Sequence, residues 1–162
     1  MTRKICVAVD NSETSKYALT WTITNIYKPE ASDIIYILHS VQMQAVSPFY
    51  SSLDASGTSA DLLISMRERE MEEGRNILKD YGVFCDQKNV KFLLELTVGD
   101  PRHTICEFVE SQNIDLLVLG NRGSGLLKRI ILGSVSDYCL NHAECPVLCV
   151  KQQISQGKEP NE

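Results

Sequence analysis

The stretch "KICVAVD" (residues 4–10) is a short, nearly continuous apolar run that ends in a carboxylate. Apolar runs without polar alternation, rich in β-branched residues, are typical of a strand buried on both faces of a parallel sheet. Four comparable runs follow along the chain: "DIIYILHSV" (33–41), "VKFLLELTV" (90–98), "DLLVLG" (115–120) and "CPVLCVK" (145–151). The sequence therefore predicts five strands.

Segments with helical signals separate these runs. We expect helices over residues 13–27, 60–81, 101–111 and 134–142, with Ser12, Asp100 and Ser134 as N-terminal capping residues of three of them. Strands that alternate with helices are typical of an α/β fold whose parallel sheet is covered on both faces. We therefore predict a doubly wound, five-stranded parallel sheet with strand order 3-2-1-4-5.

The composition is that of an ordinary globular protein. The 162 residues suit one domain, expected over residues 1–151, followed by a loose C-terminal tail at 152–162. The net charge is −5 and the basic residues are scattered, which argues against nucleic acid as a partner. No apolar stretch approaches the roughly 20 residues of a membrane span, and the N-terminus lacks the apolar region of a signal peptide. We expect a cytoplasmic protein without a membrane partner.

Residues 42–60 combine Ser, Gly and Pro and show no periodicity. An insertion of this length without secondary structure is usually a functional lid or a disordered segment. We therefore expect a flexible insertion, and its position directly after the second strand is that of a lid over a ligand site.

The most distinctive segment is "LGNRGSGLLKRIILGSVS" (residues 119–136), which follows the fourth strand and leads into the last helix. Glycines allow close backbone approach and leave N–H groups available to an anion. A helix that begins at Ser134 adds unpaired N–H groups and a partial positive charge. The serine hydroxyls and the basic side chain of Arg122 complete a candidate phosphate cradle, and Lys128 and Arg129 either add positive charge to it or face solvent.

The predicted topology brings a second segment to this cradle. In a doubly wound sheet, ligands bind beyond the carboxyl ends of the strands where the strand order reverses, here between strands one and four. Asp10 ends the first of these strands and Gly120 the other. The glycine pattern is neither a P-loop nor the G-x-G-x-x-G of dinucleotide folds, so Walker-type hydrolysis and NAD chemistry are not supported.

The spacing of the glycines is G-x-x-G-x9-G-[ST], formed by Gly120, Gly123, Gly133 and Ser134. This motif resembles that of nucleotide-binding universal stress proteins. The flanking segments "VAVDNSETSKYALTW", "VGDP", "IDLLVLGNRG" and "GSVSDYCLNHAECPVLCVK" are similar to that family as well. The resemblance covers nearly the whole chain except the insertion and the tail.

The resemblance implies a flavodoxin-like (HUP/Rossmann-like) fold and a stress-response regulatory protein that binds ATP or AMP, the ATP accompanied by Mg²⁺ or Mn²⁺. It also implies a homodimer that forms through the last strand, at residues 146–151. The nucleotide-binding residues that it implies are Ala8, Val9, Asp10, Val41, Leu119, Gly120, Arg122, Gly123, Gly133, Ser134, Val135 and Ser136. Among these, Asp10 would accept hydrogen bonds from a ribose hydroxyl and the Val41 backbone would read the adenine edge.

Three alternatives remain open from the sequence. The first is a slow ATP hydrolase that uses the same pocket; no obvious base lies in the loop, since Asp10 is assigned to the ribose and His39 is a weaker candidate. The second is a nucleotide-independent dimerising scaffold, against which the complete glycine motif argues. The third, a flavin-binding protein, would need glycines after the first strand, where "DNSETS" has none. We assign no catalytic residue, and the six cysteines and three histidines show no spacing that is typical of a metal site.

Overall fold

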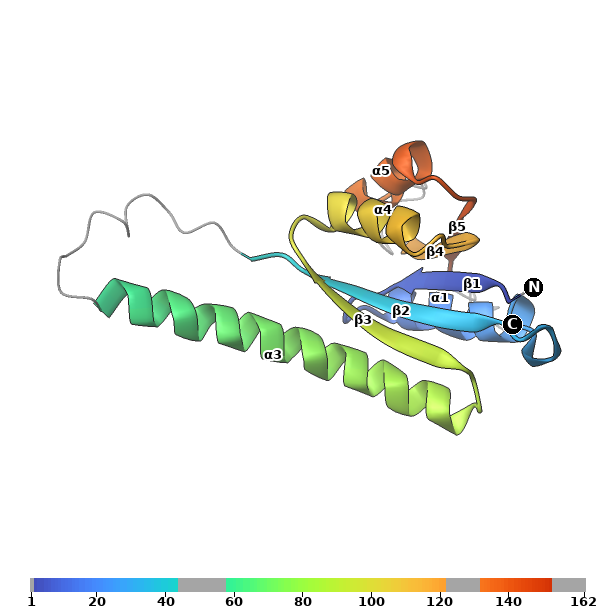
Figure 1. Cartoon of the computed structure of the whole chain (residues 1–162), viewed down its shortest axis with the longest axis horizontal. Helices are drawn as coiled ribbons and strands as arrows, with labels where there is room; N and C mark the ends of the chain where they lie inside the picture. The colour runs from blue at the N-terminus through green and yellow to red at the C-terminus, as the bar shows by residue number, and fades with distance from the viewer. Residues whose placement is uncertain (1, 44–57, 122–131, 153–162) are drawn as a thin grey trace, which may run out of the picture.

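The computed structural model of the chain describes residues 2–43, 58–121 and 132–152 (Figure 1). Within these residues, strands and helices alternate as the sequence predicts. The elements are β1 (Lys4–Ala8), α1 (Glu13–Asn25), the 3-10 helix η1 (Pro29–Ala31), β2 (Ile34–Val41), α3 (Thr58–Gln87), β3 (Phe92–Val98), α4 (Pro101–Ser111), β4 (Leu116–Asn121), α5 (Ser134–His142) and β5 (Val147–Lys151).

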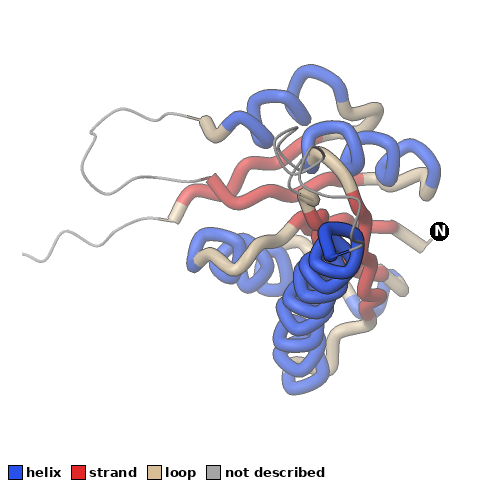
Figure 2. Tube along the Cα trace, turned by 90° about the vertical axis from the view of Figure 1, so that its left-hand side faces the viewer, coloured by secondary structure: helices blue, strands red, loops and turns tan. Residues whose placement is uncertain are grey.

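The strands form one sheet with the order β3-β2-β1-β4-β5, which confirms the predicted topology. Each neighbouring pair is parallel, and the central strand β1 aligns Val7 with Ile37 of β2 and with Val118 of β4. Helices α1 and α3 cover one face of the sheet and α4 and α5 cover the other, as the two views in Figures 1 and 2 show. The carboxyl ends of β1 and β4 therefore lie side by side at the point where the strand order reverses.

Two apolar cores hold these layers together, one on each face of the sheet. Alternate residues of β1 enter different cores because successive side chains of a strand point to opposite faces. Ile5 and Val7 pack with Leu19 of α1 and Leu78 of α3, whereas Cys6 packs in the second core with residues of α4 and α5. The interiors of the three central strands β1, β2 and β4 are mainly buried, and this double burial explains their continuous apolar runs, whereas the edge strands β3 and β5 are partly exposed.

Helix α3 is longer than the prediction of residues 60–81. It begins at Thr58, inside the expected insertion, and it ends at Gln87. Gly82 does not end the helix because Tyr81 and Cys85, one turn apart, are both buried on the sheet side. The chain turns at Asn89, which has a positive φ of 53°. Residues 44–57, which include most of the expected lid, lie outside the described residues.

The helix caps match the sequence at two of three positions. Ser12 accepts a hydrogen bond from the Ser15 N–H (3.2 Å), and Asp100 accepts one from the Arg102 N–H (3.0 Å). The third expectation is wrong, because Gly133 is the N-cap of α5 and Ser134 is its first helical residue. Among the described residues, no side chain caps the α5 N-terminus. In the described parts of the chain, no helix has both the length and the apolar character that a membrane span requires.

Candidate functional site

A cavity of about 250 Å³ lies beyond the carboxyl ends of the central strands. Its walls come from the ends of β1, β2 and β4 and from the first turns of α1, α4 and α5. The lining residues are Ala8, Val9, Asp10, Ser12, Thr14, Ser15, Leu38, His39, Ser40, Gln42, Pro101, Ile105, Leu119, Gly120, Gly133, Ser134, Val135 and Ser136. A larger hollow beside α3 draws its whole lining from residues 65–75 of that one helix, so it is an open surface rather than an enclosed site.

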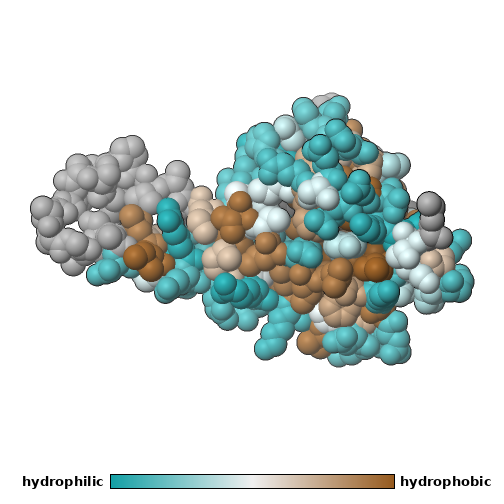
Figure 3. All heavy atoms as spheres, in the orientation of Figure 1, coloured by the Kyte–Doolittle hydropathy of each residue, from teal (hydrophilic) through white to brown (hydrophobic). Residues whose placement is uncertain are grey.

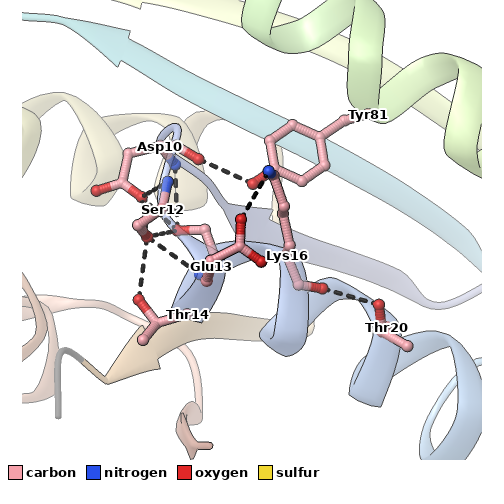
Figure 4. A network of polar contacts seen from close by, with 8 residues as sticks. Asp10, Ser12, Glu13, Thr14, Lys16, Thr20 and Tyr81 are labelled. Carbon is pink, nitrogen blue, oxygen red and sulfur yellow. Dashed lines mark hydrogen bonds and ion pairs between the residues drawn. The ribbon is translucent and has the colours of Figure 1, made fainter. Parts of the chain in front are cut away.

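The loop between β1 and α1 forms a compact polar network on one wall of this cavity (Figure 4). The Asp10 carboxylate accepts hydrogen bonds from the Ser12 N–H (3.0 Å), the Ser12 hydroxyl and the Ser15 hydroxyl (2.7 Å). The Asp10 N–H donates to the Ser15 hydroxyl (3.2 Å), and the Tyr81 hydroxyl donates to the Asp10 carbonyl (2.8 Å). Both the backbone and the side chain of Asp10 are therefore held in place.

Gly120, near the end of β4, packs against the first turn of α1. A Cβ atom at position 120 would lie 2.7 Å from the Thr14 carbonyl oxygen and 3.0 Å from the Ser15 nitrogen. Both contacts are to backbone, which has no flexible tip that could move aside. The absence of a side chain at Gly120 lets β4 and the first turn of α1 approach each other, so the N-terminus of α1 borders the cavity.

The N-terminus of α5 forms another wall. Gly133 precedes this helix, and among the described residues nothing lies within 4 Å of the position that its Cβ would occupy. Gly133, Ser134, Val135 and Ser136 line the cavity, so the first N–H groups and the positive end of the α5 dipole border it. Two helix N-termini, those of α1 and α5, thus border the same cavity. This arrangement favours an anionic ligand.

The end of β2 supplies the third side of the cavity, through His39, Ser40 and Gln42. His39 Nδ1 lies 2.8 Å from the Val9 carbonyl oxygen, which can only accept, so Nδ1 carries a proton. The Ser40 hydroxyl lies 2.8 Å from the hydroxyl of Thr104 on α4. Val41 itself is buried, and its carbonyl accepts a hydrogen bond from the Gly99 N–H (3.0 Å).

The structure brings most of the sequence-predicted site residues into one place. The predicted residues that line the cavity are Ala8, Val9, Asp10, Leu119, Gly120, Gly133, Ser134, Val135 and Ser136. Val41 does not line it, although its neighbours Ser40 and Gln42 do. Arg122 and Gly123 lie outside the described residues, as do Lys128 and Arg129. The role of each residue in binding remains a prediction.

Part of the polar lining of the cavity was not predicted from the sequence. Ser12, Thr14 and Ser15 border the cavity, although Ser12 was assigned only a capping role. The hydroxyl-rich run "DNSETS" directly after β1 was the available signal, but without glycines it did not match a known phosphate motif. Among the residues that the structure describes, no group of three or more His, Cys, Asp and Glu side chains is placed to hold a metal ion.

Comparison with known proteins assigns the chain to one family. Residues 1–151 match the model of the universal stress protein family. The chain belongs to this family. It is 37% identical over 150 residues to a universal stress protein of Methanocaldococcus jannaschii, a match that covers 93% of this chain and 82% of that protein. It is 30% identical over 162 residues to a universal stress protein A-like protein of Arabidopsis thaliana, covering 94% of this chain and 92% of that protein.

Solved structures of universal stress proteins share this fold. A family member from Arabidopsis thaliana, crystallised with AMP bound, superimposes with a TM-score of 0.67 at 26% identity, covering 95% of this chain and 94% of that one. The UspA protein of Lactobacillus plantarum gives a TM-score of 0.70 at 23% identity and covers 91% of this chain and 97% of its own. The flavodoxin-like, doubly wound sheet is therefore that of the universal stress proteins.

Proposed function

We propose that this universal stress protein binds an adenine nucleotide, ATP or AMP, in the cavity at the ends of β1 and β4, and that it acts as a stress-response regulatory protein. The observation that carries this proposal is the convergence of two helix N-termini, those of α1 and α5, with the Asp10 carboxylate on one cavity. Helix N-termini favour phosphate, and a carboxylate favours the hydroxyls of a ribose. The AMP-bound relative from Arabidopsis thaliana supports the same ligand class.

The binding mode follows from the chemistry of each wall. The phosphates would lie on the N–H groups of α5, beside the hydroxyls of Ser134 and Ser136, with Arg122 and Gly123 from the preceding loop. The ribose would meet Asp10, and the base would meet the end of β2 near Val41. Mg²⁺ or Mn²⁺ would arrive with the ATP phosphates, which supply oxygen ligands of the kind that these ions prefer.

Binding rather than hydrolysis is the function that the residues favour. Asp10 and His39 are the titratable side chains among the described lining residues, and both are engaged in holding the backbone or the helix start. The His39 Cδ2 atom faces α3, where it would lie 3.3 Å from a Cβ at Gly74. His39 thus packs as part of the fold, and slow hydrolysis would depend on charge stabilisation by the cradle.

Isothermal titration calorimetry with ATP and AMP, each with and without Mg²⁺, tests the proposal. We expect saturable binding of an adenine nucleotide and weaker binding of GTP. Gly133→Val is the informative variant, because its side chain would enter the open space next to the α5 N-terminus while its backbone, at φ −67° and ψ 155°, suits any residue. Affinity for ATP should fall at least about tenfold, the effect of losing one charge-assisted contact.

Two outcomes of this titration would contradict the proposal. No binding of ATP or AMP at millimolar concentration would leave the nucleotide-independent scaffold as the better reading. Unchanged ATP affinity in a folded Gly133→Val variant would show that the phosphates do not bind at the α5 N-terminus. Loss of ATP above a buffer control over a day would instead add the slow hydrolase activity to the binding function.

A further inference from the structure

Tyr81 connects helix α3 to the candidate nucleotide site. Its hydroxyl donates to the carbonyl oxygen of Asp10 over 2.8 Å, although the two residues are 71 positions apart in the sequence. The ring is 5% exposed and belongs to the core between α1, α3 and the sheet. Figure 4 shows it reaching from α3 to the loop that follows β1. Tyr81 is outside the set of residues that line the cavity.

This contact completes a set of restraints around the Asp10 backbone. The preceding carbonyl, that of Val9, is held by His39 of β2 (2.8 Å), and the Asp10 N–H donates to Ser15 of α1 (3.2 Å). Tyr81 then holds the Asp10 carbonyl from α3. Three separate elements therefore fix the two peptide groups that flank the Asp10 Cα. The direction of the Asp10 side chain depends on these peptide groups, because they set the orientation of the Cα–Cβ bond.

The hydroxyl of Tyr81 is suited to act as a permanent donor. Burial raises the pKa of Tyr81, and the negative charges of Asp10 and Glu13 raise it further, so the hydroxyl stays protonated over the whole physiological range. A phenylalanine ring would fill the same core space without this donor. The tyrosine therefore adds one specific hydrogen bond to a packing role that an apolar ring could also fill.

We propose that Tyr81 is a positioning residue that sets the selectivity of the site for a nucleotide with an intact ribose, by fixing the Asp10 peptide so that the carboxylate meets the ribose hydroxyls. This inference rests on the proposed adenine-nucleotide binding and on the ribose role of Asp10. Without the Tyr81 contact, the peptide that follows Asp10 loses this hydrogen bond and gains freedom to turn. The carboxylate keeps its bonds to Ser12 and Ser15, and its alignment with the ribose becomes less exact. The phosphate contacts at α5 come from a different wall and are not affected.

The test compares ATP with 2′,3′-dideoxy-ATP, which lacks both ribose hydroxyls. The dissociation constants of the two nucleotides are measured by calorimetry for the wild type and for Tyr81→Phe. The wild type should prefer ATP at least about tenfold, as expected for hydrogen bonds to a charged group. In Tyr81→Phe the affinity for ATP should fall about three- to tenfold while that for 2′,3′-dideoxy-ATP stays the same, so the preference for ATP falls by the same factor.

Tyr27→Phe is the matched control, because the Tyr27 hydroxyl also bonds a backbone group, the Lys91 N–H at 2.9 Å, away from the cavity. It should leave both dissociation constants unchanged. Asp10→Ala should abolish the preference for ATP, and adding Tyr81→Phe to it should cause no further loss, since Tyr81 acts through the Asp10 carboxylate. Should Tyr81→Phe fold poorly in a thermal melt, Tyr81→Met removes the same hydroxyl with a side chain that adapts to irregular core space.

The possible results separate this inference from the proposed function. No binding of ATP by the wild type would overturn the nucleotide-binding function itself. A wild type that binds ATP and 2′,3′-dideoxy-ATP equally well would overturn the inference alone. So would a folded Tyr81→Phe variant that keeps the wild-type ratio, or one that loses affinity for both nucleotides to the same extent.

Discussion

At the scale of single residues, Gly120 and Gly133 show how one motif can contain glycines with different physical roles. Both belong to the same spaced pattern, but a Cβ at Gly120 would contact the Thr14 and Ser15 backbone, whereas one at Gly133 would meet no described residue within 4 Å. Gly120 is therefore needed for the close packing of β4 on α1, and that packing places no such demand on Gly133. The sequence pattern does not distinguish these two roles, because both positions read simply as glycine.

We predict that Gly120→Ala lowers the free energy of unfolding by about 1–3 kcal/mol, the usual cost of forcing an extra methyl group into a closely packed contact. Gly133→Ala should cost less, at most about 1 kcal/mol, the usual preference for glycine over alanine at an N-cap. Urea unfolding followed by circular dichroism measures both. Equal stability of the two variants would show that β4 can move away from α1 at little cost.

At the scale of elements, the strands could be predicted more reliably than the helix ends. All five strands appear as apolar runs in the sequence, and the predicted bounds of β1 to β5 agree with the structure to within two residues at each end. Burial on both faces accounts for these runs in β1, β2 and β4, whereas β3 and β5 lie at the edges and are partly exposed. The end of α3 depends on burial of Tyr81 and Cys85 against the sheet, which is a tertiary contact with no local signature. The cap of α5 was assigned to Ser134 from its residue type, but the helix starts there and Gly133 precedes it.

Helix α3 contains two glycines that allow its packing to be tested. A Cβ at Gly74 would lie 2.6 Å from Cγ2 of the buried, β-branched Val41, which has little freedom to move. A Cβ at Gly82 would lie 3.2 Å from Cδ1 of Leu94, a side chain that is 40% exposed and can turn outward. Alanine favours a helix interior over glycine by about 1 kcal/mol, so the clash decides the sign at each position.

We predict that Gly82→Ala raises the free energy of unfolding by about 0.5–1 kcal/mol and that Gly74→Ala lowers it by about 1–2 kcal/mol. Thermal and urea unfolding of the two single variants provide the measurement, and each serves as the control of the other within one helix. If Gly74→Ala is also stabilising, α3 is not held tightly against the end of β2.

At the scale of the whole molecule, the position of the site could be predicted because it follows from topology. Parallel strands in the order 3-2-1-4-5 bring Asp10 and Gly120 together whatever their loops contain. The finer composition of the walls could not be predicted in the same way. Ser15 and Tyr81 act on Asp10 through contacts between different elements, and their spacing in the sequence carries no signal of this.

Each edge of the sheet offers a surface for the proposed homodimer. Edge strands can pair with a strand of another chain because one side of their backbone makes no hydrogen bonds within the sheet. At one edge, β5 pairs only with β4 among the described residues, and Val147 and Leu148 are partly exposed. At the other edge, β3 exposes Leu93, Leu94 and Val98, and Figure 3 shows apolar side chains gathered there beside α3. The exposed apolar area alone would favour β3 as the dimer interface, whereas the resemblance to the family favours β5.

A pair of charge substitutions distinguishes the two edges. We predict that the wild type sediments as a dimer at micromolar concentration and that Val147→Lys on β5 shifts it to a monomer, because a buried, unpaired ammonium group at an interface is strongly unfavourable. Leu93→Lys on β3 should remain dimeric, since its side chain is 45% exposed and would stay in water. Analytical ultracentrifugation gives the masses, and a thermal melt verifies that each variant is folded. If Leu93→Lys is monomeric and Val147→Lys is dimeric, the interface lies at β3. It would then be next to α3, the helix that carries Tyr81.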